Sequence, residues 1–267
     1  MARDHSRPVK PAVQRMLRGE VLRREQVSPH VLRITIGDGE LDAFAPMGFD
    51  QWFRFFFPRD GQAEFRLPGR GDLIGYAQFL ATPARVRPHM RNYSVRELRR
   101  EGSGTRIDID LVLHAGGVAS GWARSARPGT QIAVLDEGIG FAPTPDAARF
   151  LLVGDETALP AIAGICASLP DTARGVAVIE IPDPADRQDL RAPQGVEIRW
   201  LPRAPGSRPG ASALAHVEHD DGLSSSGTYA FAAGEASLAT GVRRHLVARG
   251  IPKADVAFCG YWRSPAR

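Results

Sequence analysis

The sequence predicts two domains of different fold class, an N-terminal antiparallel β-barrel of the Greek-key type and a C-terminal α/β domain with a parallel sheet. The first half offers about six strand-like segments with turn signals and one short helix, a pattern typical of a small barrel. The second half alternates strand-like and helix-like segments, as parallel α/β sheets do. Pro143, Thr144 and Pro145 separate the two patterns, so we expect domains at residues 18–142 and 147–267.

The expected barrel strands are runs in which apolar or β-branched residues alternate with polar ones or stand together between turn signals. They cover residues 19–27, 30–36, 50–58, 89–97, 105–113 and 129–135. Residues 59–88 are rich in Gly and Pro, which predicts a long loop with little regular structure. A Gly-rich turn after residue 113 leads into a short helix at about Val118–Ala126.

The second half reads as strands joined by helices with clear end signals. The strands are expected at 149–153, 176–181, 196–201, 228–232 and 255–259, and the helices at 156–169, 211–217 and 235–249. Pro170 ends the first helix, and Gly250 with Pro252 ends the last. This order predicts a sheet whose ligand crevice lies at the carboxyl ends of its strands.

Composition limits the function classes. The chain has 267 residues, 43% of them hydrophobic and 24% charged, with a net charge of +4. No apolar run approaches the roughly 20 residues that span a bilayer, so we expect no stable membrane insertion. We see no secretory signal and expect a cytoplasmic monomer. The arginines are dispersed, which argues against a nucleic-acid partner.

Two cysteines, Cys166 and Cys259, lie far apart and form no CxxC pair. They suggest buried small side chains in a reducing compartment, and we predict no metal site from them.

Residues 91–94 combine a cation, an aromatic ring and a hydroxyl in one expected strand. Arg91 and Tyr93 would share one face of it, because side chains alternate along a strand. The guanidinium of Arg91 matches phosphate oxygens, Tyr93 can pack on a ring system, and Ser94 offers a hydroxyl. The set suits a flavin dinucleotide, although an ordinary strand with a surface arginine would read the same way.

The turn that contains His114 and Gly117 precedes a helix N-terminus, where free backbone N–H groups and the helix dipole favour phosphate. Val118, Ala119 and Ser120 would supply those groups, and Ser120 also carries a hydroxyl. A plain strand–turn–helix connection with a structural histidine is the alternative.

The first strand-to-helix turn of the second half contains Gly154, Asp155, Glu156 and Thr157. It has one glycine and two carboxylates, which should repel a pyrophosphate. Glu235 lies at another such turn, where it can line the same crevice or offset the helix dipole. The segment after residue 181 carries Asp183, Asp186 and Arg187; the carboxylates favour a free 2′-hydroxyl and so NADH, whereas Arg187 would suit NADPH.

Four stretches in order, Arg91–Ser94, Leu113–Ala123, Gly154–Ile162 and Ala233–Ser237 with Gly260–Arg263, make the chain resemble the siderophore-interacting, ferric-siderophore reductase family of the ferredoxin-reductase superfamily. The resemblance spans about residues 18–263. The turn before the short helix departs from it, because the family often has a proline before Ala-Ser. The resemblance implies a flavin-dependent oxidoreductase that passes electrons from NAD(P)H through FAD to chelated Fe(III) and releases Fe(II) for iron acquisition.

The resemblance also implies roles for single residues and needs no catalytic acid or base. The flavin would be held by Arg91, Tyr93, Ser94, His114, Gly117, Val118, Ala119 and Ser120. The nicotinamide site would be bordered by Asp155, Glu156, Thr157 and Glu235, and Trp262 would cover the flavin ring. Arg54 and Arg263 would attract an anionic ferric siderophore, although Arg54 can equally face solvent.

Two other functions stay open, a broader flavin or ferric-chelate reductase and a non-enzymatic flavin or siderophore carrier. The sequence does not decide the siderophore, the choice between NADH and NADPH, the oligomeric state, or whether ferredoxin can be the donor.

Overall fold

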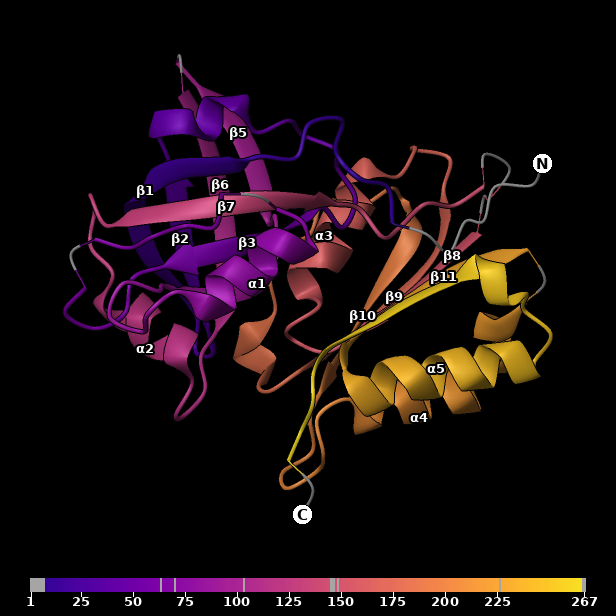
Figure 1. Cartoon of the computed structure of the whole chain (residues 1–267). Coiled ribbons are helices and arrows are strands. Elements are labelled where there is room, and N and C mark those ends of the chain that lie inside the picture. The colour runs from indigo at the N-terminus through magenta and orange to yellow at the C-terminus, as the bar shows by residue number, and fades with distance from the viewer. Residues whose placement is uncertain are drawn as a thin grey trace. The chain divides into compact units, whose positions relative to one another are not determined.

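Seven antiparallel strands form the first half of the fold in the computed structural model, which describes residues 8–62, 64–69, 71–102, 104–144, 147, 149–225 and 227–265 (Figure 1). The strands are β1 (Met16–Ser28), β2 (Val31–Gly37), β3 (Trp52–Phe57), β4 (His89–Ser94), β5 (Glu97–Glu101), β6 (Gly104–Val112) and β7 (Gln131–Gly138). They pair in the order β4-β3-β7-β1-β2-β6-β5. Their inner side chains, among them Val21, Ile34, Phe55 and Ile109, form one fully buried core.

The two edge strands of this order, β4 and β5, are consecutive in the chain, so the sheet curls until its edges are joined by a short connection. Only Val95 and Arg96 separate β4 from β5. The Val95 N–H donates to Gln51 O over 2.8 Å, and the Arg96 N–H donates to Asp108 O over 2.9 Å. The expected single strand at 89–97 is therefore wrong beyond Ser94, because the chain crosses there from β3 to β6.

The long loop predicted for 59–88 is also wrong in part, because it contains α1 (Leu73–Ala81). The Asp72 carboxylate accepts from the Gly75 N–H over 3.0 Å and caps the helix. Phe79 packs edge-on against Phe56 of β3, with ring centroids 5.8 Å apart. The glycines and prolines that suggested a loop lie on both sides of the helix. The predicted short helix after Gly117 is confirmed as α2 (Val118–Ser125).

Five parallel strands form the second sheet, in the order β10-β9-β8-β11-β12. Its elements are β8 (Arg149–Gly154), α3 (Leu159–Ser168), β9 (Arg174–Ile181), β10 (Gly195–Pro202), α4 (Ala211–His219), β11 (Thr228–Glu235), α5 (Ala236–Ala248) and β12 (Val256–Trp262). Short 3₁₀ turns are η1 (Gly39–Ala43), η2 (Pro184–Asp186), η3 (Asp221–Ser224) and η4 (Lys253–Asp255). The order reverses between β8 and β11, which is where such sheets bind ligands.

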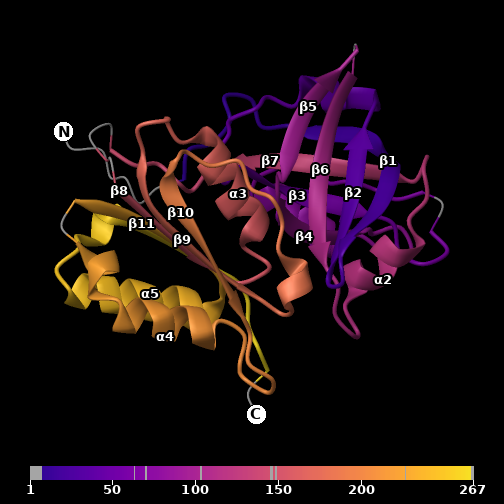
Figure 2. The same ribbon diagram turned by 180° about the vertical axis from the view of Figure 1, so that it is seen from behind.

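Helices cover both faces of this sheet. Phe150 and Leu152 of β8 pack in the core that contains α3, and the alternate residues Leu151 and Val153 pack with α4 and α5. Figures 1 and 2 show α4 and α5 side by side on one face and α3 on the other. The predicted pair of fold classes is confirmed.

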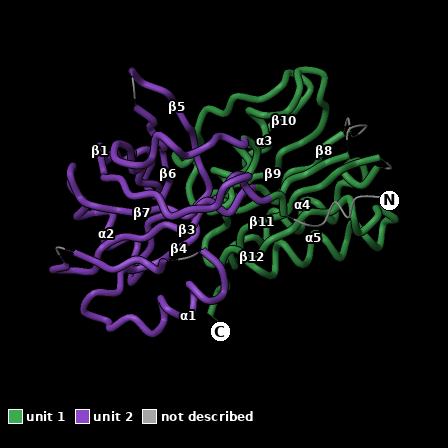
Figure 3. Tube along the Cα trace, turned by 45° about the horizontal axis from the view of Figure 1, so that its top comes forward, with its two compact units in different colours: residues 1–9, 48–50, 139–267 green, residues 10–47, 51–138 purple. Residues whose placement is uncertain are grey.

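The chain divides into two compact units, shown in Figure 3. Residues 10–47 and 51–138 form the barrel unit, and residues 1–9, 48–50 and 139–267 form the α/β unit. Asp50 belongs to the α/β unit, where its carboxylate accepts from the N–H groups of Gly140 and Phe141. Pro145 of the predicted linker lies outside the described residues.

The two cysteines differ in burial. Cys166 is buried in α3, but Cys259 is exposed on β12, so the expectation of two buried thiols is wrong for Cys259. None of the helices in the described part of the chain combines the length and hydropathy needed to cross a bilayer.

Candidate functional site

Along the Arg–Asn–Tyr–Ser stretch of β4 the side chains change from exposed to buried. Arg91 is exposed, and its Nη1 donates to Met90 O over 2.8 Å. Tyr93 is half-buried against Phe55, with ring centroids 5.9 Å apart. Burial raises the pKa of the Tyr93 phenol, so it stays neutral at any ordinary pH. Ser94 is buried at the end of the strand, opposite Trp52.

Helix α2 begins without a side-chain cap. Gly117 is the N-cap residue and has no side chain to accept from the first turn. A Cβ there would lie 2.5 Å from the His114 ring, which explains the glycine. The first intrahelical bond runs from the Gly121 N–H to Gly117 O. The preceding N–H groups at residues 118–120 are therefore available to an anion.

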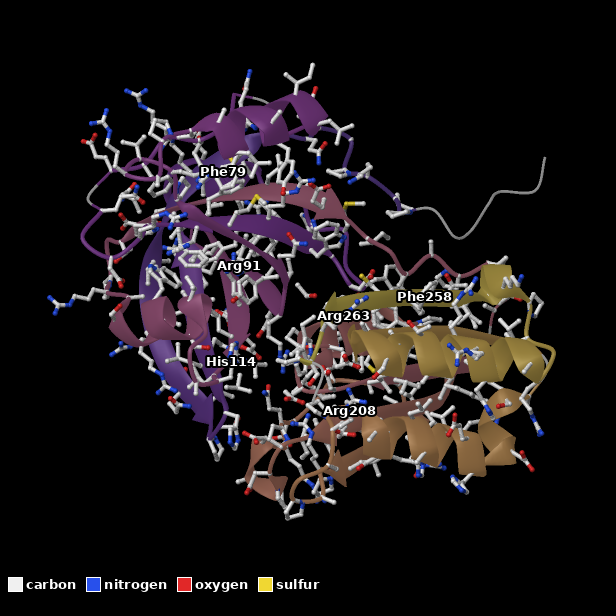
Figure 4. The ribbon with its side chains drawn as sticks, turned by 60° about the horizontal axis from the view of Figure 1, so that its bottom comes forward. Phe79, Arg91, His114, Arg208, Phe258 and Arg263 are labelled. Carbon is white, nitrogen blue, oxygen red and sulfur yellow. The ribbon has the colours of Figure 1, made fainter. Side chains whose placement is uncertain are left out.

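Ser120 holds this turn together with its hydroxyl. It accepts from the His114 N–H over 3.2 Å and donates to Val112 O over 3.1 Å. The hydroxyl proton of Ser120 is therefore already used in a hydrogen bond within the protein. The donors that stay available to a phosphate at this turn are backbone N–H groups. The His114 ring is exposed, and Figure 4 shows it and Arg91 on the barrel unit.

Asp155 joins three strand ends of the parallel sheet. Its Oδ1 accepts from the Thr157 N–H over 2.9 Å and from the Thr157 hydroxyl over 2.5 Å. Its Oδ2 accepts from the Glu235 N–H over 2.7 Å and from the Trp262 indole N–H over 3.0 Å. Gly234, at φ +119°, is needed beside it, because a Cβ there would lie 2.5 Å from Asp155. Burial raises the pKa of Asp155, and these four donors oppose that shift.

Glu156 is buried in an ion-pair network beside this turn. It contacts Arg203, whose Nε also donates to Glu180 over 2.6 Å. The Glu180 carboxylate in turn caps α4 by accepting from the N–H groups of Gly210, Ser212 and Ala213. Burial and the neighbouring Asp155 raise the pKa of Glu156 to about 7, and Arg203 opposes them. The N-terminus of α4 is thus occupied by a carboxylate of the chain itself.

Glu235 is the N-cap of α5. It accepts from the Ser237 N–H over 2.6 Å and from the Ser264 N–H over 3.1 Å. Burial opposes its ionisation, but these donors outweigh burial and lower the pKa of Glu235. Its carboxylate therefore stabilises a helix start, which is the structural alternative given above, and it also anchors the C-terminal segment.

The segment after β9 uses its carboxylates as a capping box around η2. The Asp183 Oδ1 accepts from the Ala185 N–H over 2.8 Å, and Asp186, which is buried, accepts from the Asp183 N–H over 3.2 Å. Arg187 and Arg208 are exposed on the loops that follow β9 and β10. Figure 4 shows Arg208 and Arg263 toward the same end of the α/β unit.

Arg54 lies on β3 beside a buried carboxylate that the sequence analysis missed. Its Nε lies 2.8 Å from Glu137 Oε1, and Glu137 also pairs with Lys10. Lys10 in turn lies 5.9 Å from the Trp52 ring. The three ionised side chains together carry a single positive charge. Arg54 is one-quarter exposed and shares the Glu137 carboxylate with Lys10, so it does not point freely into solvent and its charge is partly offset.

These features can now be set beside known proteins. Two family models match, the siderophore-interacting FAD-binding domain over residues 20–139 and the siderophore-interacting protein over residues 147–265. The crystal structure of the siderophore-interacting protein SipS from Aeromonas hydrophila is 31% identical, with a TM-score of 0.74 over 94% of this chain and 100% of that one. The chain belongs to the siderophore-interacting protein family. Its barrel is the FAD-binding domain of that family.

Two curated relatives extend the comparison. An uncharacterised protein of Mycobacterium tuberculosis is 37% identical over 186 residues, which is 69% of this chain and 64% of that protein's length. The NADPH-dependent ferric-chelate reductase of Escherichia coli is 29% identical over 249 residues, 91% of each chain.

The barrel unit fits the flavin dinucleotide that the family implies. The open N–H groups at residues 118–120 and the exposed Arg91 are donors for pyrophosphate, and the half-buried Tyr93 offers a ring face. In the α/β unit, Asp155, Thr157 and Trp262 meet at the strand-order reversal, which is the place where such sheets bind ligands. Sequence reasoning missed Arg203, Glu180 and Lys10, whose partners are distant in the chain.

Proposed function

We propose that the chain is a flavin-dependent ferric-siderophore reductase, with an FAD-binding domain at residues 18–142 and an NAD(P)H-binding domain at 147–267. The observation that carries the proposal is the uncapped N-terminus of α2, an anion site in a family FAD-binding domain. The second unit adds a parallel sheet whose order reverses at Asp155, where a nicotinamide dinucleotide would be held.

The side chains act by binding and orientation. Arg91 and the N–H groups of Val118, Ala119 and Ser120 hold the pyrophosphate, and Tyr93 and Ser94 hold the ring system. When bound, FAD supplies the conversion of a two-electron hydride donor into single electrons for Fe(III). Asp155, Glu156, Thr157 and Glu235 border the nicotinamide. The Trp262 indole is held beside Asp155 by its hydrogen bond. Arg54 and Arg263 draw an anionic ferric chelate, and the reaction takes place in the cytoplasm.

The purified protein tests this proposal directly. It should be yellow with a flavin absorption spectrum, and NADH or NADPH under argon should bleach it. Adding a ferric siderophore should restore the flavin spectrum while an Fe(II) indicator develops colour. A colourless protein that fails to bind added FAD would contradict the proposal.

The relative named as an NADPH-dependent ferric-chelate reductase favours one second candidate, a reductase of simple ferric chelates. Anaerobic kinetics with ferric citrate, ferric siderophores and free flavin would distinguish the two. A higher kcat/KM for ferric siderophores supports the first proposal, and equal values for all ferric chelates support the second. A flavin that neither nicotinamide nucleotide reduces would identify a carrier.

A further inference from the structure

Helix α1 is apolar on the face that points away from the barrel. Its inner residues Gly75 and Phe79 are buried, and Phe79 packs with Phe56 and Phe65 on the outside of the sheet. Leu73, Ala77 and Leu80, spaced four and three apart, share the opposite face. A helix that is apolar all round is normally covered on all sides.

The outer face is nevertheless exposed. The exposed fractions are 86% for Leu73, 55% for Ile74, 41% for Tyr76 and 52% for Leu80. Gln78 is the only polar side chain between Leu73 and Ala81. Four large apolar side chains gathered on nine residues form a patch of the kind that marks an interaction surface.

Arginines lie at the C-terminal end of this helix. Arg87 Nη1 donates to Leu80 O over 2.7 Å, and its guanidinium lies 6.0 Å from the Phe79 ring. The exposed Arg66 and Arg85 are held nearby, because the Arg66 N–H donates to Val86 O over 2.8 Å. Residues 59–88 contain five arginines against the three acids Asp60, Glu64 and Asp72, a net charge of +2.

We propose that α1 docks this protein on an anionic membrane surface. An apolar helix face flanked by arginines is the combination that interfacial helices use, with the apolar residues in the acyl boundary and the cations at the headgroups. The convex face of a single helix can enter lipid directly, whereas a protein partner would need a matching groove. Tyr76 suits the headgroup level, because its ring is apolar and its hydroxyl polar. At nine residues α1 is too short to span, so it lies in the interface.

Co-sedimentation with lipid vesicles tests the proposal on the full-length protein. Wild type should bind phosphatidylcholine vesicles that contain phosphatidylglycerol, and less well those without it. Leu73→Ser with Leu80→Ser should lower the partition coefficient at least about tenfold, because both leucines lose their apolar surface. Arg66→Gln with Arg85→Gln should lower binding to the anionic vesicles only, and added salt should do the same.

The matched control is Val13→Ser with Phe258→Ser, which removes two exposed apolar side chains elsewhere, 73% and 45% exposed. It should bind vesicles as wild type does. All variants should stay folded at the assay temperature and keep the wild-type FAD content, since none of these side chains belongs to a buried core. Docking needs no flavin reaction, so this test and that of the proposed function can fail independently.

Three results would overturn the inference. The first is that wild type binds neither kind of vesicle. The second is that the Leu73→Ser, Leu80→Ser variant binds the anionic vesicles as well as wild type does. The third is a dimer in analytical ultracentrifugation that this variant abolishes, because the face would then belong to a second copy of the chain.

Discussion

Asp155 and Glu156 are adjacent buried carboxylates that the fold stabilises in different ways. Asp155 receives four hydrogen bonds from neutral donors, and Glu156 receives the cation Arg203. The expected repulsion between these two carboxylates and a pyrophosphate is therefore reduced. Glu156 shares Arg203 with Glu180, and the carboxylate oxygens of Asp155 accept hydrogen bonds inside the turn.

Glu156→Gln should flatten the dependence of stability on pH. The folded protein raises the pKa of Glu156 from 4.5 to about 7. Between these values the folded state keeps a proton that the unfolded state has lost, so stability falls as pH rises through this window. Each pKa unit corresponds to about 1.4 kcal/mol. Tm measured against pH should fall less steeply in the variant. Glu218→Gln, on the exposed surface of α4, is the control and should keep the wild-type slope.

Arg91→Ala should weaken FAD retention. A charge-assisted hydrogen bond to phosphate contributes about 1.5–3 kcal/mol, or roughly tenfold to a hundredfold in affinity. Fluorescence titration of the apoprotein measures this, with the exposed Arg23→Ala as control. FMN, which lacks the second phosphate, should bind wild type less well than FAD. Equal FAD affinity in wild type and Arg91→Ala would remove Arg91 from its proposed role.

At the scale of elements, the periodicity of apolar residues predicted most helices and strands. It could not predict features that depend on contacts between residues distant in the chain. The alternation of Ile107, Ile109 and Leu111 with polar neighbours was enough to predict β6, because its apolar face packs in the barrel core. The expected half-buried strand is wrong for the other face, where Asp108 and Asp110 are buried and pair with arginines. α1 was missed because its residues are apolar on every side and show no helical period. The Asp155–Trp262 hydrogen bond joins residues 107 positions apart, and no local pattern contains it.

Gly117→Ala and Gly121→Ala form a matched pair within the α2 region. A Cβ at residue 117 would lie 2.5 Å from the His114 ring, whereas one at residue 121 meets nothing within 4 Å. Gly117→Ala should displace the ring or the turn and lower FAD affinity several-fold. Gly121→Ala should leave FAD affinity unchanged and stabilise the helix by up to about 1 kcal/mol. FAD titration and thermal unfolding of the two variants give the comparison. Identical FAD affinities would show that the turn geometry is not needed for the flavin.

The loops after β9 and β10 bear on the choice of nucleotide. The predicted preference for NADH rests on Asp183 and Asp186, but Asp186 is buried in the capping box, so repulsion of a 2′-phosphate now depends on Asp183. The exposed Arg187 stays the residue that the sequence predicts to favour NADPH, and the exposed Arg208 on the next loop is a second candidate for that role. Arg208→Ala should lower kcat/KM for NADPH about tenfold and leave NADH within about twofold, since only NADPH carries that phosphate. Asp183→Asn should raise kcat/KM for NADPH instead. If Arg208→Ala lowers kcat/KM for NADH and for NADPH by the same factor, Arg208 does not bind the 2′-phosphate.

At the scale of the whole molecule, the proposed activity requires both units, because the proposal assigns FAD to the barrel unit and the nicotinamide dinucleotide to the α/β unit. The proposal also assigns the iron chelate one cation from each unit, Arg54 and Arg263. The two differ in environment, since Arg54 pairs with Glu137 whereas Arg263 is exposed.

Arg263→Ala should raise KM for anionic ferric chelates several-fold at low salt, because an exposed charge acts over about 10 Å at 0.1 M. Arg54→Ala should do the same to a smaller extent, because Glu137 already offsets its charge. Flavin reduction by NADH should change little in either variant, and high salt should remove the KM difference. Steady-state assays with an anionic and a neutral chelate test this. Unchanged KM values in both variants would exclude the two arginines as chelate-binding residues.

The hydrogen bonds of Asp155 also concern the entropy of ligand binding. They fix the ends of β8, β11 and β12 relative to one another through contacts within the protein alone. The conformational freedom of these turns is therefore lost when the chain folds, and little remains to be lost when a nucleotide arrives. Preorganisation of this kind strengthens binding without adding a contact, because the ligand need not order the turns that hold it.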